Sequence, residues 1–174
     1  MRPCSALISG NAGRLAIAAL QARGEKPVAL VRSPEKATGP GVEVRPFDCA
    51  SANPAVLKGV DTLVLISSSD FNDRAGQHRN AIAAAKEAGV GRIVYTSILK
   101  GDANPMLLAA DHIATEAALT VSGIPATILR NGWYAENYTA ALGAADPAGQ
   151  TDLPAPLAGE RARMGLSRSR PAKS

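Results

Sequence analysis

The stretch SGNAGRLAIAALQARG (residues 9–24) contains two glycines, Gly10 and Gly13, directly before an apolar pattern of helical spacing. In folds that bind dinucleotides, glycines at the first strand-to-helix turn let the backbone approach a pyrophosphate, and the N–H groups at the start of the helix then face that anion. A complete motif has another glycine three residues before Gly10, where this chain has Leu7. The stretch therefore predicts either a phosphate-binding turn or an ordinary capping turn.

Apolar runs of strand length alternate with segments of helical periodicity over most of the chain. Strands are expected at 4–9, 27–32, 42–48, 62–69, 92–97 and 125–133. Helices are expected at 14–24, 53–59, 74–89 and 106–123, with a helical turn at 33–36. This alternation predicts right-handed crossovers and hence an α/β fold, a Rossmann-like, doubly wound parallel sheet of about six strands with helices on both faces.

Ligands of such a sheet bind beyond the carboxyl ends of its strands. At the head of this series, the glycine turn favours phosphate binding over simple capping. Ser97, which ends the fifth expected strand, is expected either to cap a loop or to contact a ligand. The strand-end residues that we therefore expect to form the site are 9–13, 32, 48, 67–69, 96–97 and 131–137.

Arg32 closes the second expected strand, after the apolar run VALV. At this position dinucleotide folds distinguish between their cofactors, because an acidic residue holds the ribose 2′-hydroxyl of NAD whereas an arginine pairs with the 2′-phosphate of NADP. The sequence therefore predicts NADP(H), with Lys36 close enough in sequence to assist. The alternative is a solvated arginine at a strand end.

The composition argues against several classes of function. A net charge of +4 without a dense run of lysine and arginine argues against nucleic acid, and no apolar run reaches the ~18 residues of a membrane span. Cys4 and Cys49 give neither a disulfide framework nor a metal spacing, so we expect no metal site and a reducing cytoplasm. The two histidines, His78 and His112, are expected to lie at the surface or on helix faces.

From about Gly143 the sequence has no aromatic residue and is rich in Ala, Pro, Gly, Ser and Arg. Such a composition is typical of a loose, disordered tail. We therefore expect two parts, an NAD(P)-binding Rossmann-like domain at 1–142 and a tail at 143–174.

Several stretches share a pattern with one known family. They are SGNAGRLAI (9–17), ALVRSPEKA (29–37), LVLISSSD (63–70), QHRNAIAAAKEAGVGRIVYTS (77–97), DHIATEAAL (111–119) and ILRNGWYAENY (128–138). Together they resemble the NmrA-like, atypical short-chain dehydrogenases, and within that group the bacterial NADPH-dependent quinone oxidoreductases. The similarity runs from about residue 9 to residue 142.

The resemblance implies a role for each matching segment. Residues 9–13 match the phosphate turn of the family, and Arg32 matches its NADP-selecting arginine. Residues 67–69 match the segment along the ribose and nicotinamide side, and 131–137 match a loop at the reactive end of the cofactor, where the quinone enters; Tyr134 and Asn131 are the implied catalytic residues. The implied cofactor-binding residues are Ser9, Gly10, Asn11, Ala12, Gly13, Arg32, Lys36, Ser67, Ser68, Ser69, Asn131, Gly132, Trp133, Tyr134, Glu136 and Asn137.

One catalytic motif of the wider superfamily is absent from the sequence. Many short-chain dehydrogenases use Tyr-x-x-x-Lys, in which the lysine lowers the pKa of the tyrosine for proton transfer. No lysine follows Tyr95, Tyr134 or Tyr138 by four residues, which disfavours alcohol–ketone chemistry. Quinone reduction needs hydride from the nicotinamide and a proton from water or a nearby donor, for which His112 is a candidate. Trp133 and Tyr134 are expected either to stack on the quinone or to cover the sheet edge.

Two functions stay open at this point. One is hydride transfer from NADPH to a quinone, with a small-molecule acceptor as the partner; the other is a non-catalytic, NADP-binding redox sensor of the NmrA type. The departures from the family pattern are Leu7 and the tail that replaces a long C-terminal portion after Leu142. They imply impaired turnover and, at Leu7, a backbone strain of about 1–3 kcal/mol. A homo-oligomer is compatible with the sequence.

Overall fold

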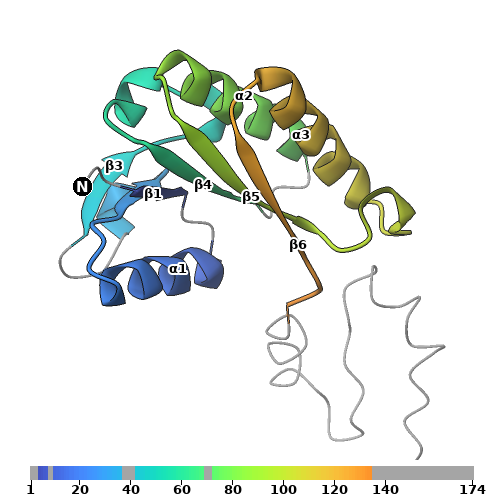
Figure 1. Cartoon of the computed structure of the whole chain (residues 1–174), viewed down its shortest axis with the longest axis horizontal. Helices are drawn as coiled ribbons and strands as arrows, with labels where there is room; N and C mark the ends of the chain where they lie inside the picture. Colours follow the sequence, from blue (N-terminus) through green and yellow to red (C-terminus); the bar gives the residue numbers. More distant parts are fainter. Residues whose placement is uncertain (1–3, 8–9, 37–41, 69–71, 135–174) are drawn as a thin grey trace, which may run out of the picture. The chain divides into compact units, whose positions relative to one another are not determined.

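The computed structural model describes residues 4–7, 10–36, 42–68 and 72–134. The chain divides into two units, Met1–Gly132 and Trp133–Ser174, and every helix and strand given below lies in the first. The six strands form one parallel sheet, as the alternating pattern predicts, and their order in it is β3-β2-β1-β4-β5-β6 (Figure 1). Their bounds are β1 Cys4–Leu7, β2 Val28–Val31, β3 Glu43–Pro46, β4 Thr62–Ile66, β5 Arg92–Ile98 and β6 Ala126–Asn131.

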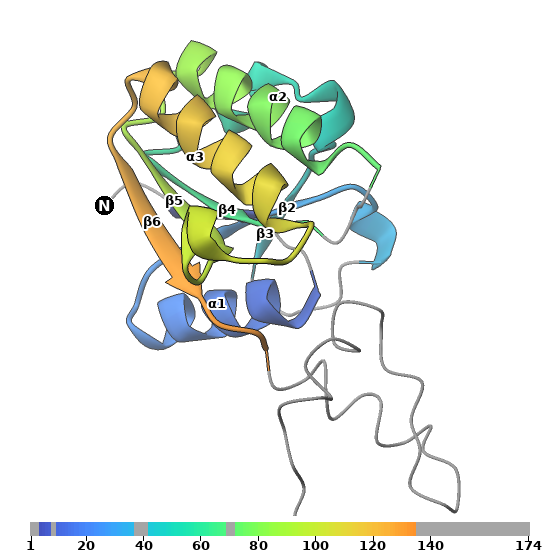
Figure 2. The ribbon, with the colours of Figure 1, turned by 90° about the vertical axis from the view of Figure 1, so that its right-hand side faces the viewer.

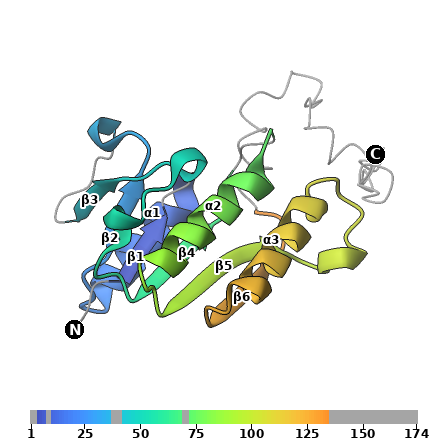
Figure 3. The ribbon, with the colours of Figure 1, turned by 90° about the horizontal axis from the view of Figure 1, so that it is seen from above.

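Three α-helices of the described residues cover the two faces of this sheet. Figure 2 shows α1 (Gly10–Ala22) on one face and α2 (Arg74–Glu87) with α3 (Ala109–Ser122) on the other, which confirms the doubly wound prediction. Seen from above, α2 and α3 run side by side (Figure 3). The expected helix at 53–59 is instead a single 3₁₀ turn, Pro54–Leu57, and further 3₁₀ turns span Pro34–Lys36, Cys49–Ser51 and Gly101–Ala103.

The start of α2 and the ends of α2 and α3 follow from their sequences. Asp73 caps α2, because its side chain accepts a hydrogen bond from the backbone N–H of Gly76 at 3.1 Å. At the other ends, Gly89 and Gly123 follow α2 and α3 with φ angles of 74° and 73°. This left-handed backbone suits glycine and terminates a helix, as the sequence predicts at both positions.

The larger hydrophobic core lies between the sheet and the pair α2–α3. In the central strands, alternate residues point into it, so that Leu63, Leu65, Ile93 and Tyr95 are fully buried. The opposite face packs against α1 through a smaller cluster, in which Ile17 is a buried member. Among the described side chains, the α2–α3 face therefore has more buried hydrophobic residues than the α1 face.

Strand β6 forms one edge of the sheet and is the most exposed strand described. Its hydrophobic side chains Ile128 and Leu129 are 37% and 44% exposed, and the burial pattern of the strand shows no buried residue. Among the residues that the structure describes, no helix has both the length and the apolar character that crossing a membrane requires.

The backbone at Leu7 differs from our expectation. Leu7 is the last residue of β1 and pairs with Leu30 of β2 in extended conformation, which any residue adopts. Among the described residues, the non-glycine residue with a left-handed backbone is Lys100, with a φ of 68°. The predicted strain at Leu7 is therefore wrong, because the turn toward α1 begins after this residue.

Candidate functional site

The parallel register brings the expected strand-end residues to one edge of the sheet. Ala6 pairs with both Ala29 and Val64, and Val64 continues the row to Val94 and Thr127. Residues three positions beyond this row lie at one level, at the ends of their strands or just after them. These residues are Arg32, Ser67, Ser97 and Arg130, and Asn131 comes one position later.

The glycine turn lies inside α1 rather than before it. We expected the helix to start after Gly13, but α1 starts at Gly10, so Gly10, Asn11, Ala12 and Gly13 form its first turn. The first N–H groups of an α-helix have no acceptor within the helix, and no acidic side chain occupies this turn. Gly13 is buried, and Ser9 lies outside the described residues. The turn therefore presents donors of the kind that bind a phosphate.

Arg32 follows β2 as predicted, and its side chain is exposed. Burial, together with the charge of Asp48, raises the pKa of the nearby Cys49 thiol to about 11. The positive charge of Arg32 opposes this rise. Lys36 ends the 3₁₀ turn Pro34–Lys36. The position of Arg32 is open to an anionic group approaching from solvent.

The turn after β4 is held at two backbone atoms. The N–H of Ser67 donates to Oγ1 of Thr96 at 2.9 Å, and the carbonyl oxygen of Ser68 accepts from Nε of Arg74 at 2.7 Å. Both serines are half-buried, and Ser69 lies outside the described residues. The first two serines of the predicted cofactor segment are therefore fixed by side chains from β5 and α2.

Asn131 ends β6, and its carbonyl oxygen accepts a hydrogen bond from the backbone N–H of Leu99 at 2.7 Å. Gly132 is exposed and closes the first unit, while Trp133 and Tyr134 begin the second; Tyr134 is 43% exposed. The roles predicted for these residues stay predictions. Glu136 and Asn137 belong to the segment 135–174, which lies outside the described residues, as does the whole of the expected tail.

A buried polar cluster between α2, β5 and α3 is the part of the site region that sequence reasoning missed. The hydroxyl of Tyr95 lies 2.7 Å from Nδ1 of His112, and Nδ1 of His78 lies 2.9 Å from Oγ1 of Thr115. Both histidines were expected at the surface or on helix faces, but His78 is 1% exposed and His112 6% exposed. Both do lie on helix faces, but the surface alternative is wrong, because these faces point into the core, where polar partners meet the rings.

The hydrogen bonds of Thr115 fix the tautomer of His78. Oγ1 of Thr115 donates its proton to the carbonyl oxygen of Asp111 at 2.7 Å, so it accepts from His78. Nδ1 of His78 therefore carries the proton. Its Nε2 is left as a buried acceptor without a partner among the described residues.

Burial keeps the aromatic members of the cluster uncharged. It lowers the pKa of His78 to about 4, with the neighbouring His112 and Arg74 acting in the same direction. It also lowers the pKa of His112 to about 4 and raises that of Tyr95 to about 12, although hydrogen bonds of Tyr95 with Thr115 and Ser67 oppose the rise. At neutral pH, none of the three rings carries a charge.

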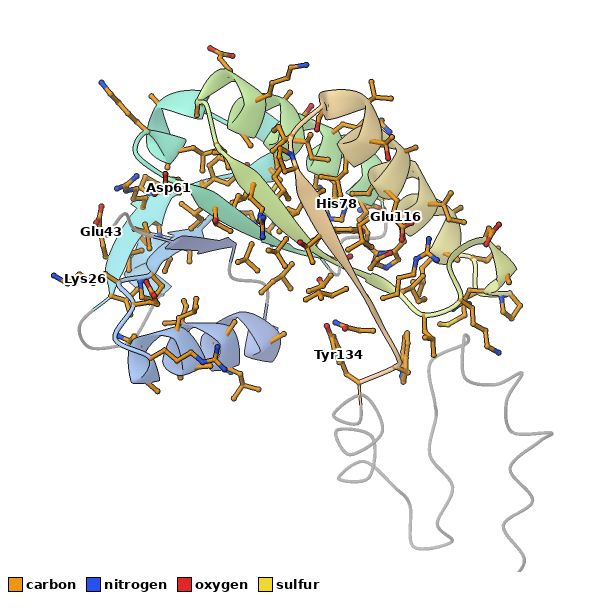
Figure 4. The ribbon with its side chains drawn as sticks, viewed as in Figure 1. Lys26, Glu43, Asp61, His78, Glu116 and Tyr134 are labelled. Atoms are coloured by element: carbon orange, nitrogen blue, oxygen red, sulfur yellow. The ribbon has the colours of Figure 1, made fainter. Side chains whose placement is uncertain are left out.

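A second group links β5, α3 and β6. Oγ of Ser97 donates to Oε1 of Glu116 at 2.6 Å, and Arg130 donates to the same carboxylate from Nε at 3.1 Å and from its terminal nitrogen at 2.7 Å. These bonds, those from Arg130 first, hold the pKa of Glu116 below its usual value. Figure 4 shows Glu116 and His78 on the α2–α3 side of the sheet. Ser97 therefore neither caps a loop nor points a free hydroxyl at a ligand.

Comparisons with known proteins agree with this arrangement. The sequence matches the NAD(P)H-binding family over residues 8–154. It is 52% identical to quinone oxidoreductase 2 of Escherichia coli (strain K12) over 123 residues, which are 68% of this chain and 43% of that protein. It is 34% identical to the NmrA-like family domain-containing oxidoreductase flvB of Aspergillus flavus over 110 residues, 56% of this chain and 35% of that protein.

A solved structure extends the comparison to three dimensions. The E. coli NADPH-dependent quinone oxidoreductase QOR2, crystallised with NADPH, superposes with a TM-score of 0.75 at 46% identity, over 81% of this chain and 53% of that one. The chain spans about half the length of these relatives. The predicted Rossmann-like fold and nicotinamide cofactor are thus confirmed, and so is the resemblance to NmrA-like quinone oxidoreductases. The chain belongs to the NAD(P)H-binding family.

Proposed function

We propose that this chain binds NADPH along the carboxyl edge of its sheet. The observation that carries the proposal is the strand order, which reverses between β1 and β4, the point where such sheets bind their ligands. The first turn of α1 stands at this point, and Arg32 stands beside it after β2. In this arrangement Gly10–Gly13 hold the pyrophosphate, and Arg32, assisted by Lys36, holds the 2′-phosphate.

We further propose that the bound cofactor reduces a quinone. NADPH supplies the hydride for such a reaction, and the relative with 52% identity is a quinone oxidoreductase. The hydroxyl groups of Tyr95 and Ser97 are bonded to His112 and Glu116, so the proton that completes the reduction comes from water rather than from these groups. Asn131, at the end of β6, lies beside the acceptor in this proposal, and the catalytic role of Tyr134 stays a prediction.

A non-catalytic, NADP-binding redox sensor is the second candidate. It is favoured by the same two contacts, because they occupy the hydroxyl groups of Tyr95 and Ser97 and so remove two candidate proton donors. A protein that senses the cofactor needs tight binding but no route for protons. The two candidates share the NADPH site and differ in turnover.

We infer a reducing compartment, the cytoplasm, because the cysteine side chain that the structure describes forms no disulfide. Cys49 is a free, partly buried thiol. Because burial raises its pKa to about 11, it stays protonated and poorly nucleophilic at neutral pH. Such a thiol fits a structural position rather than disulfide chemistry.

One experiment separates the two functions. NADPH binding to the 174-residue chain is first measured by fluorescence titration. NADPH oxidation is then followed by the absorbance at roughly 340 nm, with a simple benzoquinone as the acceptor. Binding with quinone-dependent oxidation supports the reductase, and binding without oxidation supports the sensor. Absence of NADPH binding would refute both.

A further inference from the structure

The order of the strands sets the direction in which a dinucleotide crosses this sheet. Arg32, after β2, is placed for the 2′-phosphate of the adenosine half, and the first turn of α1, next to β1, is placed for the pyrophosphate. Strand β4 adjoins β1 on the side opposite β2. The nicotinamide half must therefore extend over the turn that follows β4, where Ser67 and Ser68 lie.

Both backbone anchors of that turn come from outside it. Ser67 is held through its N–H by Thr96 of β5, and Ser68 is held through its carbonyl oxygen by Arg74, the first residue of α2. These two bonds join the turn to the next strand and to the next helix. Ser67 and Ser68 are thus held by side chains of neighbouring elements even though they belong to no helix or strand.

Arg74 is an unusual anchor because its charged side chain is only 4% exposed. A buried guanidinium is costly unless it is paired and hydrogen-bonded. Its terminal nitrogen lies 3.6 Å from Oδ2 of Asp111 on α3, while its Nε bonds Ser68. The chain therefore buries the charge of Arg74 at a place where the side chain bonds Ser68, in the segment predicted to contact the cofactor.

We propose that Arg74 is a positioning residue for the nicotinamide half of the cofactor, acting through the Ser68 carbonyl oxygen without touching the cofactor itself. Thr96 acts in the same way through the N–H of Ser67. This inference rests on the proposed NADPH site. It predicts different effects on the two halves of the cofactor, because the two anchors contact the turn after β4 and not Arg32 or the first turn of α1.

The test compares two ligands on the full chain. NADPH probes both halves, and 2′,5′-ADP probes the adenosine half alone; both are titrated by calorimetry. Arg74→Met keeps the length of the side chain and removes the donor. We expect it to weaken NADPH binding roughly tenfold or more, the fold-change of a lost hydrogen bond to a charged group, while the affinity for 2′,5′-ADP changes less than about twofold.

Matched variants control for general damage to the fold. Arg79→Met removes an exposed arginine from the same helix and should leave both affinities unchanged. Thr96→Val removes the second anchor and should repeat the selective loss of NADPH affinity, whereas Thr96→Ser keeps the acceptor oxygen and should restore it. Because the threonine pair tests the same turn independently, the proposal stays falsifiable if Arg74→Met fails to fold.

The outcomes are distinguishable. Selective loss of NADPH affinity in Arg74→Met and Thr96→Val supports the proposal. Equal weakening of NADPH and 2′,5′-ADP would mean a merely structural role and would overturn it, as would unchanged NADPH affinity in both variants. A wild-type chain that bound neither ligand would refute the proposed function, and this inference with it.

Discussion

Mild acid should destabilise this fold through His78. In the unfolded chain the imidazole titrates with a pKa near 6.5, whereas in the folded chain burial lowers this pKa to about 4. As the pH falls below 6.5, the unfolded state takes up a proton that the folded state does not. The stability that the neutral imidazole contributes is therefore present above pH 6.5 and is lost as the pH falls toward 4.

The size of this effect follows from the two pKa values. One pKa unit corresponds to about 1.36 kcal/mol, so the full difference is about 3 kcal/mol. Between pH 7 and pH 5 the loss from His78 alone is about 2 kcal/mol, a large fraction of the stability of a small domain. His112, whose pKa is lowered in the same direction, makes the total loss larger.

Urea unfolding of the wild type and of His78→Asn at pH 7, 6 and 5 measures the effect. Asparagine keeps a polar group near the position of Nδ1, toward Thr115, but does not titrate. It also loses the edge-to-face contact of the imidazole with Tyr95, in which the ring centroids are 5.5 Å apart, so the variant should be less stable at pH 7.

The variant should nevertheless lose less stability than the wild type on acidification, by about 2 kcal/mol between pH 7 and 5. Arg79→Gln, a change at the next residue of α2, where the side chain is exposed, should leave the pH dependence unchanged. Equal slopes for the wild type and His78→Asn would refute the reasoning.

Three further outcomes follow from the described contacts. Arg32→Ala should weaken NADPH about tenfold or more and NADH little, because a charge-assisted pair contributes about 1.5–3 kcal/mol; titrations of both cofactors check this, and equal wild-type affinities would contradict it. Tyr95→Phe should reduce the unfolding free energy by about 1–3 kcal/mol in urea titrations, since Nδ1 of buried His112 loses its partner; an unchanged midpoint would argue against the bond. Leu119→Ala should cost about 2–5 kcal/mol, because this side chain is 1% exposed in the larger core; a loss below 1 kcal/mol would imply that the core relaxes to fill the space.

The order of the elements was predictable because parallel strands buried on both faces read as apolar runs. TLVLI (β4) and VALV (β2) contain no charged residue, and each helix between the strands carries a periodic pattern with a glycine after it. The strand-end residues could be assigned to one edge for the same reason, since all strands of a parallel sheet end on the same side. The order of elements along the chain and their parallel arrangement thus follow from local pattern.

The buried polar cluster was not predictable in this way. His78 and Thr115 are 37 residues apart, and their hydrogen bond exists because α2 and α3 pack side by side on the same face. The spacing of His112, Thr115 and Glu116 on α3, three and four positions apart, does indicate a shared face. It does not reveal whether polar residues on that face meet water or meet Tyr95 and Ser97. The burial of the histidines depended on those distant partners.

The start of α1 was misplaced for a different reason. Glycines weaken helices in general, so the pattern argument began the helix only after Gly13. In the structure the first helical turn contains both Gly10 and Gly13. A helix end that meets a ligand favours small residues at this turn despite their low propensity, because their backbone N–H groups stay accessible.

The unequal cover of the two sheet faces has a consequence for how the molecule opens. Among the side chains that the structure describes, the cluster on the α1 face has two buried members, Ile17 and Ala29, whereas that on the α2–α3 face has fifteen. Amide hydrogens of α1 should therefore exchange with deuterium through a partial opening that leaves β5 protected. The first turn of this same helix is placed for the pyrophosphate, so cofactor binding should slow hydrogen exchange most in α1. The stability of the α1 layer against local opening should therefore depend on bound cofactor.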